Sequence, residues 1–139
     1  MPFDGRTAAP IAAQMRALVG PNARNWRQSL YWDERRGVGC LMGLILRAQD
    51  VNPAELAQDT RLWDGATREK ARMSGTLLVA AILRHASERI PIIGTFDGPR
   101  DWAKVVAFND QAAKPSDILP IIDALEEIEL ERAEASVAA

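Results

Sequence analysis

The stretch GVGCLMGL, residues 37–44, places the only cysteine of the chain between glycines, directly before an apolar run with helical spacing. Glycines at this density mark backbone that turns tightly or approaches another segment closely, because glycine has no Cβ atom. The stretch therefore predicts a position where the fold is pinned. It points to architecture rather than to catalysis.

The residues after Cys40 predict a helix that ends near Asp50 and is packed along one face. Gly43 would let another element pack closely against it. The apolar residues of that face are Leu41, Leu44, Ile45 and Ala48.

Two longer helices are expected in the second half of the chain. Residues 68–87 are the longest helical candidate, and residues 77–83 are apolar nearly all round, which predicts a central helix contacted from several sides. Ser116 is the expected N-cap of the last helix. The amphipathic stripe of that helix consists of Ile118, Leu119, Ile121, Ile122, Leu125 and Ile128.

Capping patterns predict the shorter helices. Thr7 is a candidate N-cap for a first helix that Gly20 ends. Asn52 followed by Pro53 opens a short helix that Gly65 closes, after which Thr67 can cap the next one.

Asp101 is the expected cap of a further helix, which ends at Asn109-Asp110. The prolines and glycines of residues 90–100 indicate a surface loop. Leu30-Tyr31-Trp32, with a turn at Arg36-Gly37, favours a short irregular hairpin.

Together these patterns predict one mostly α domain spanning residues 1–139. It would contain five or six helices and a small β-hairpin near residues 28–39. Residues 132–139 have little to bury and are expected to fray.

Composition excludes several classes of protein. A hydrophobic content of 47% with 26% charged residues is typical of a soluble globular domain. The longest apolar run, residues 77–83, is far shorter than the ~20 residues of a membrane span, so a cytoplasmic protein with no membrane contact is expected. One cysteine and one histidine allow neither an internal disulfide nor a zinc cage, and no metal or cofactor is predicted.

Charge is distributed unevenly along the chain. From Pro115 onward seven acids and one base give −6, so the preceding residues, with 16 bases and 12 acids, carry +4. An acidic last helix would serve either as an electrostatic surface for a partner or as a solvated helix face. The solvated face is the preferred interpretation.

Two segments resemble an uncharacterised family of short bacterial and phage proteins, a domain of unknown function. Cys40–Leu44, preceded by Trp26 and a turn at Gly37, is similar to that family's cysteine, two residues, glycine, small residue and leucine. Leu44 stands where the family has its small residue.

The second segment is similar to the same family's tryptophan, asparagine and aspartate turn followed by a capped amphipathic helix. It comprises residues 107–110, then Ser116 and residues 118–125, with Phe108 in place of the tryptophan. The middle of the chain has no counterpart. The resemblance implies a compact, mostly helical unit and transfers no activity.

A thiol hydrolase is one functional hypothesis. Cys40 at a helix N-terminus, with His85 and either Asn109 or Asp110, would supply papain-like groups, and the helix dipole would lower the pKa of the thiol. Free cysteine is, however, among the most buried residue types, and Cys40 begins an apolar stripe. We therefore predict a packing role for Cys40 and a half-buried His85 with a carbonyl partner, and no catalytic residue.

Binding of single-stranded nucleic acid is a second hypothesis, because arginines interleaved with aromatics can bind phosphates and stack on bases. The alternative is a hairpin with half-buried aromatics and solvated arginines, and the acidic pI of about 5.4 favours it. The residues concerned are Arg24, Arg27, Arg35 and Arg36 around Trp26, Tyr31 and Trp32.

The preferred hypothesis is a non-enzymatic interaction protein that binds another protein. Arginine and tryptophan are enriched in binding hot spots. Asn109 and Asp110 would either end a helix or form an exposed patch, and the loop at residues 90–100 and the acidic helix are further candidate surfaces. The predicted binding residues are Arg24, Trp26, Arg27, Trp32, Arg35, Arg36, Asn109 and Asp110.

Overall fold

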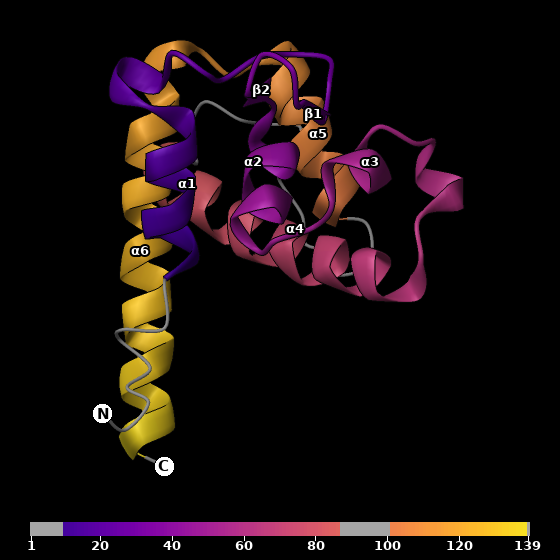
Figure 1. Ribbon diagram of the computed structural model, residues 1–139. Helices are drawn as coiled ribbons and strands as arrows, with labels where there is room; N and C mark the ends of the chain where they lie inside the picture. The colour runs from indigo at the N-terminus through magenta and orange to yellow at the C-terminus, as the bar shows by residue number, and fades with distance from the viewer. Residues whose placement is uncertain (1–9, 87–100, 139) are drawn as a thin grey trace.

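The computed structural model describes residues 10–86 and 101–138. In this part of the chain the structure is mostly α-helical with one small hairpin, as predicted (Figure 1). The α-helices are α1 (Ile11–Val19), α2 (Leu41–Ala48), α3 (Pro53–Leu56), α4 (Gly65–Ala86), α5 (Asp101–Gln111) and α6 (Pro115–Ala138). Two 3₁₀ turns, η1 (Pro21–Ala23) and η2 (Thr60–Leu62), and two strands, β1 (Trp32–Asp33) and β2 (Val38–Gly39), complete it.

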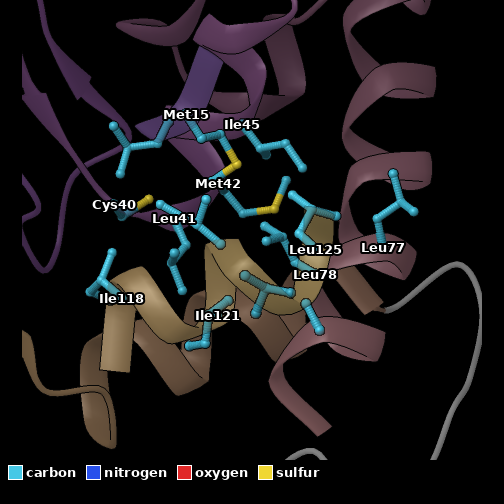
Figure 2. Close-up of a cluster of buried hydrophobic side chains, with 14 of the residues drawn as sticks. Met15, Cys40, Leu41, Met42, Ile45, Leu77, Leu78, Ile118, Ile121 and Leu125 are labelled. Carbon is cyan, nitrogen blue, oxygen red and sulfur yellow. The ribbon is translucent and has the colours of Figure 1, made fainter. Parts of the chain in front are cut away.

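α4 is the central helix, as its apolar run predicted. It packs against α6, α5 and α2, while α1 packs against α2 and α6. Figure 1 shows α1 alongside one half of α6, and the other half of α6 extending beyond the remaining described helices. Side chains from α1, α2, α4 and α6 meet in the apolar core that Figure 2 draws, where Met15, Met42, Leu78 and Leu125 are fully buried.

α2 is the most enclosed helix, because residues 41–46 are all buried. Cys40 is its N-cap and accepts a hydrogen bond from the Gly43 amide at 3.5 Å. A Cβ atom at Gly43 would lie 1.4 Å from the carbonyl oxygen of Tyr31, and one at Gly39 would lie 2.3 Å from the same oxygen. The close backbone approach predicted for the GVGCLMGL stretch is therefore confirmed.

The predicted hairpin is present but short. β1 and β2 are antiparallel, with Trp32 opposite Gly39 and Asp33 opposite Val38. Gly37 has a φ of +65°, as the predicted turn requires. Trp26 forms an additional parallel bridge with Gly39, so three segments of backbone converge there.

Two predicted caps were wrong. Gly65 was expected to close α3, but it is the first residue of α4. The N-cap of α4 is Asp64 rather than Thr67, because the Asp64 carboxylate accepts a hydrogen bond from the Thr67 amide at 2.8 Å. α3 itself begins as predicted, with the Asn52 side chain accepting the Ala54 amide at 2.8 Å.

At the start of α6 the capping side chain is Asp117 rather than the exposed Ser116. The Asp117 carboxylate accepts the Lys114 amide at 3.0 Å. Asp117 is the third residue of α6, and its own amide donates to the Lys114 carbonyl. Its carboxylate therefore reaches back to Lys114, the residue before the helix, as in a capping box. Pro120 lies within this helix.

α1 begins at Ile11, and the residue before it, Pro10, forms no side-chain capping hydrogen bond. Glu129 of α6 performs this function, since its carboxylate accepts the amides of Ile11 at 2.9 Å and Ala12 at 2.7 Å. Thr7, the expected cap, lies outside the described residues, as does the predicted loop at 90–100. α6 continues through residues 132–138, whose fraying stays a prediction.

The acids of α6 are largely engaged within the chain. Arg16 of α1 pairs with Asp123 at 2.9 Å and with Glu126 at 3.3 Å. Arg84 of α4 pairs with Glu131 at 2.7 Å and with Glu127 at 3.4 Å. These four carboxylates are 42–65% exposed, so they lie on a solvated face of α6, as preferred, and also pair with arginines of α1 and α4.

Candidate functional site

The arginine loop, defined as residues 20–39, connects α1 to α2 and carries most of the predicted binding residues. Its backbone is irregular: Asn22, Ala23 and Ser29 have φ values of 56°, 54° and 67°. This left-handed conformation costs about 1–2 kcal/mol for a residue other than glycine, so neighbouring contacts must enforce it. Strain of this kind is concentrated at functional sites.

Asn109 of α5 supplies hydrogen bonds that attach the arginine loop to the helices. Its side chain is 0% exposed. The side-chain oxygen accepts hydrogen bonds from the Trp26 indole at 2.6 Å and from the Leu41 amide at 3.0 Å, and the side-chain nitrogen donates to the Arg27 carbonyl at 3.2 Å. One buried amide thus joins the arginine loop, α2 and α5.

Asp110 adds a second attachment. One of its carboxylate oxygens accepts the amide of Ser29, a left-handed residue, at 2.8 Å, and the side-chain nitrogen of Asn109 at 3.0 Å. The prediction that these two residues end their helix was wrong, because α5 continues to Gln111. The buried Asn109 cannot form an exposed patch either, and it acts by holding the arginine loop in place.

The tryptophans of the arginine loop are in the core. Trp26 is 7% exposed and Trp32 is 8% exposed, which leaves neither ring face open to a nucleic-acid base. Trp32 is also covered by the guanidinium of Arg47, 5.9 Å from its ring centre. These two residues support the loop and offer little surface to a partner.

Tyr31 belongs to an aromatic cluster that the sequence did not indicate. Its ring meets Trp63 edge-on at 5.2 Å between ring centres, and Trp63 stacks on Trp102 at 5.3 Å. The Trp102 indole donates a hydrogen bond to the Tyr31 hydroxyl at 3.1 Å. The three rings lie far apart in the sequence, so no local pattern could bring them together.

The arginines of the loop, in contrast, are all exposed: Arg24, Arg27, Arg35 and Arg36. Arg27 donates to the backbone carbonyls of Arg24 and Trp26. Arg36 has Asp33 at 3.8 Å. Among the described residues, no carboxylate lies within 4 Å of the guanidinium of Arg24, Arg27 or Arg35.

Cys40 does not have the properties of a nucleophile. Its side chain is 4% exposed, and burial raises the pKa of the thiol to about 11, outweighing the opposing effect of the Gly43 and Met42 amides. The thiol is therefore protonated at neutral pH, as its predicted packing role requires. The other member of the hypothetical pair, His85, is half-buried, and its Nε2 lies 3.1 Å from a carboxylate oxygen of Asp117.

A pocket of 110 Å³ opens beside the arginine loop. The loop contributes Ser29, Leu30 and Tyr31 to its wall, Val106 and Asp110 come from α5, and Cys40 completes it. Sequence reasoning missed Leu30 and Val106 as site residues. Leu30 was expected in the hairpin, and Val106 lies in the helix expected after Asp101. The sequence carries no signal that they share a cavity.

The described part of the chain contains neither a candidate metal cluster nor a membrane-spanning helix. Residues 10–86 and 101–138 contain no group of three or more His, Cys, Asp or Glu side chains arranged to bind a metal ion. Within the same ranges, no helix is long and apolar enough to cross a lipid bilayer.

Comparison with known protein families, with curated proteins and with solved structures finds no match to this chain. The resemblance to an uncharacterised family therefore stays a prediction. The site has to be interpreted from its own geometry and charge.

Proposed function

We propose that this chain is a non-enzymatic interaction protein and that the arginine loop binds an acidic surface of another protein. The observation that supports this most directly is a set of exposed guanidinium groups without carboxylate partners on a strained, firmly held loop. Guanidinium groups form charge-assisted hydrogen bonds with carboxylates, and a fixed loop loses little conformational freedom on binding.

The contacts beneath the loop explain how it would bind a partner without catalysing a reaction. Asn109 and Asp110 fix the backbone at Arg27 and Ser29, so the arginines start from a defined position. Complementary charge then steers the partner and sets its orientation. The effect on the partner would be occupation of its surface.

The two alternative functions have less support. Single-stranded nucleic acid would find phosphate-binding arginines, but Trp26 and Trp32 are buried and cannot stack on bases. A thiol hydrolase would need an accessible thiolate, whereas Cys40 is buried with a raised pKa. We also propose that the protein is cytoplasmic and that it is encoded by a bacterium, a phage or another mobile element.

Affinity capture from the source cell with two matched variants tests the proposal. Arg24→Glu/Arg35→Glu reverses two unpaired charges of the loop, whereas Arg72→Glu/Arg132→Glu makes the same change in net charge on α4 and α6. We expect one or more proteins to be captured by the wild-type chain and by the α4/α6 variant, and to be lost with the loop variant.

Three further readouts make the result decisive. Thermal unfolding of both variants shows that their folds are intact. Capture that survives nuclease treatment supports a protein partner, whereas loss on nuclease treatment, with retention of an oligonucleotide on a filter at low salt, would favour the nucleic-acid hypothesis. Equal capture by the two variants would contradict the role of the arginine loop.

A further inference from the structure

We infer that the pocket beside the arginine loop receives one aliphatic side chain of the partner, so that the preferred ligand is an acidic segment with a single apolar anchor. This inference rests on the proposed function and specifies its ligand. The loop supplies Ser29, Leu30 and Tyr31 to the pocket wall, so a partner that docks on this part of the loop lies against the opening.

The size of the pocket suits a branched aliphatic side chain. Its volume of 110 Å³ is far above the room a single water needs, about 10–15 Å³, and approaches the ~150 Å³ of an apolar cavity that holds benzene. A leucine or valine side chain is of this order, whereas an indole ring is larger. Leu30 and Val106 supply apolar wall atoms against which such a group would pack.

Charge determines which residues of the ligand can occupy the pocket. Asp110 lines it, and one of its oxygens already accepts two hydrogen bonds, so a ligand carboxylate inside would meet a like charge. Outside it, Arg24 and Arg35 have no carboxylate within 4 Å among the described residues. The ligand should therefore place its apolar residue inside and its acids on the rim.

The wall itself is rigid. The Leu30 carbonyl accepts the Cys40 amide at 3.0 Å, and the Ser29 amide is held by Asp110. The protonated Cys40 thiol, with its pKa of about 11, presents an uncharged wall at neutral pH. A pocket that is already formed can bind an apolar anchor without reorganisation.

Three peptide probes test this inference by NMR titration: acetyl-EEEELEEEE-amide, the same peptide with a central serine, and acetyl-KKKKLKKKK-amide. For the wild-type chain we expect the leucine peptide to bind about tenfold more tightly than the serine peptide, because burial of one aliphatic side chain contributes on this scale. The methyl resonances of Leu30 and Val106 should shift only with the leucine peptide.

Variants separate the anchor from the charge. Val106→Leu fills the pocket and Leu30→Ala removes its exposed wall, and each should reduce the tenfold preference to about one while acidic peptides still bind. Arg24→Glu/Arg35→Glu should weaken both acidic peptides equally and leave the preference unchanged.

The possible failures are distinguishable. Equal binding of the leucine and serine peptides to the wild-type chain, or a preference that survives both pocket variants, would overturn the anchor and leave the arginine loop as a charged surface. Binding of the acidic peptides no tighter than that of the lysine peptide would overturn the proposed function itself and the anchor with it.

Discussion

The arginines of α1 and α4 that face α6 pair with its carboxylates, whereas most arginines of the arginine loop have no carboxylate partner among the described residues. Arg16 and Arg84 each contact two carboxylates of α6, and these pairs join helices that are distant in sequence. Arg24 and Arg35 have no such partner among the described residues. Charge in the first region contributes to the fold, and charge in the second is available for binding.

The two regions are also held to the rest of the chain by different interactions, ion pairs at α6 and buried hydrogen bonds beneath the arginine loop. At α6 the joining groups are exposed or half-buried side chains, whose ion pairs are weak and screened by salt. Beneath the arginine loop the joining group is Asn109, which is fully buried and makes three hydrogen bonds to other segments. Buried hydrogen bonds are costly to leave unmade, so the loop should be the more sensitive region.

Gly43→Ala should have the largest effect. The added Cβ would lie 1.4 Å from the Tyr31 carbonyl oxygen, so α2 and the arginine loop must separate. We expect a loss of at least about 3 kcal/mol in the free energy of unfolding, measured by urea denaturation. Gly65→Ala is the matched control, because an added Cβ there meets no atom within 4 Å, and it should change stability by less than about 1 kcal/mol.

Asn109→Ala should rank second. It leaves the Trp26 indole and the Leu41 amide without their buried acceptor, which should cost about 2–4 kcal/mol. Asp110→Ala removes a partly exposed acceptor of the Ser29 amide and should cost about 1 kcal/mol. Equal losses for the two variants, measured in the same unfolding assay, would contradict the central position assigned to Asn109.

Alkaline pH should lower the free energy of unfolding, because the buried Cys40 thiol beneath the arginine loop resists ionisation. Its pKa is raised from the ordinary value of 9.0 to about 11, so the folded chain retains a proton that the unfolded chain releases between these values. The contribution of Cys40 to the free energy of unfolding is therefore fully present below pH 9 and is lost as pH rises through 11, by about 3 kcal/mol in total. Unfolding of wild type and Cys40→Ala between pH 8 and 11 isolates this contribution, since the variant lacks it, and parallel curves would contradict it.

The smallest effect is expected for single arginines. Arg16→Gln removes two ion pairs with α6 and should lower stability by about 0.5–1 kcal/mol, an effect that 1 M salt reduces. Arg24→Gln removes no ion pair and should stay within about 0.5 kcal/mol of the wild type. A larger loss for Arg24→Gln than for Arg16→Gln would show that the charges of the arginine loop also serve the fold.

The sequence predicted much of the fold because its signals are local. The spacing of apolar residues indicated α2, α4 and α6, and glycine density indicated that another segment approaches Gly43 closely. The structure identifies that segment as the backbone at Tyr31. Caps were less predictable where several polar residues stand close together, as at Asp64 and Thr67, because only the geometry decides which side chain accepts the amide.

The candidate site was predicted in part. The sequence indicated the arginines of the loop and Asn109-Asp110 as candidate binding residues, and it favoured partly buried aromatics beside solvated arginines, as the structure has them. It did not place Asn109 in the core. Asn109 has its amide in the core because Trp26 and Leu41, 83 and 68 residues away, both donate to it. Contacts between residues so far apart in the sequence produce no local pattern from which they could be predicted.

By itself, the sequence determined that the chain forms helices with a tight glycine-dependent approach before α2, because propensity, capping and apolar spacing act over a few residues. Only the tertiary structure decided which arginines have a carboxylate partner and which do not. The carboxylates of α6 meet Arg16 and Arg84 through helix packing, while the arginine loop is held by Asn109 and Asp110 away from such partners. Charge pairing depends on distance in space, and the order of residues along the chain does not specify that distance.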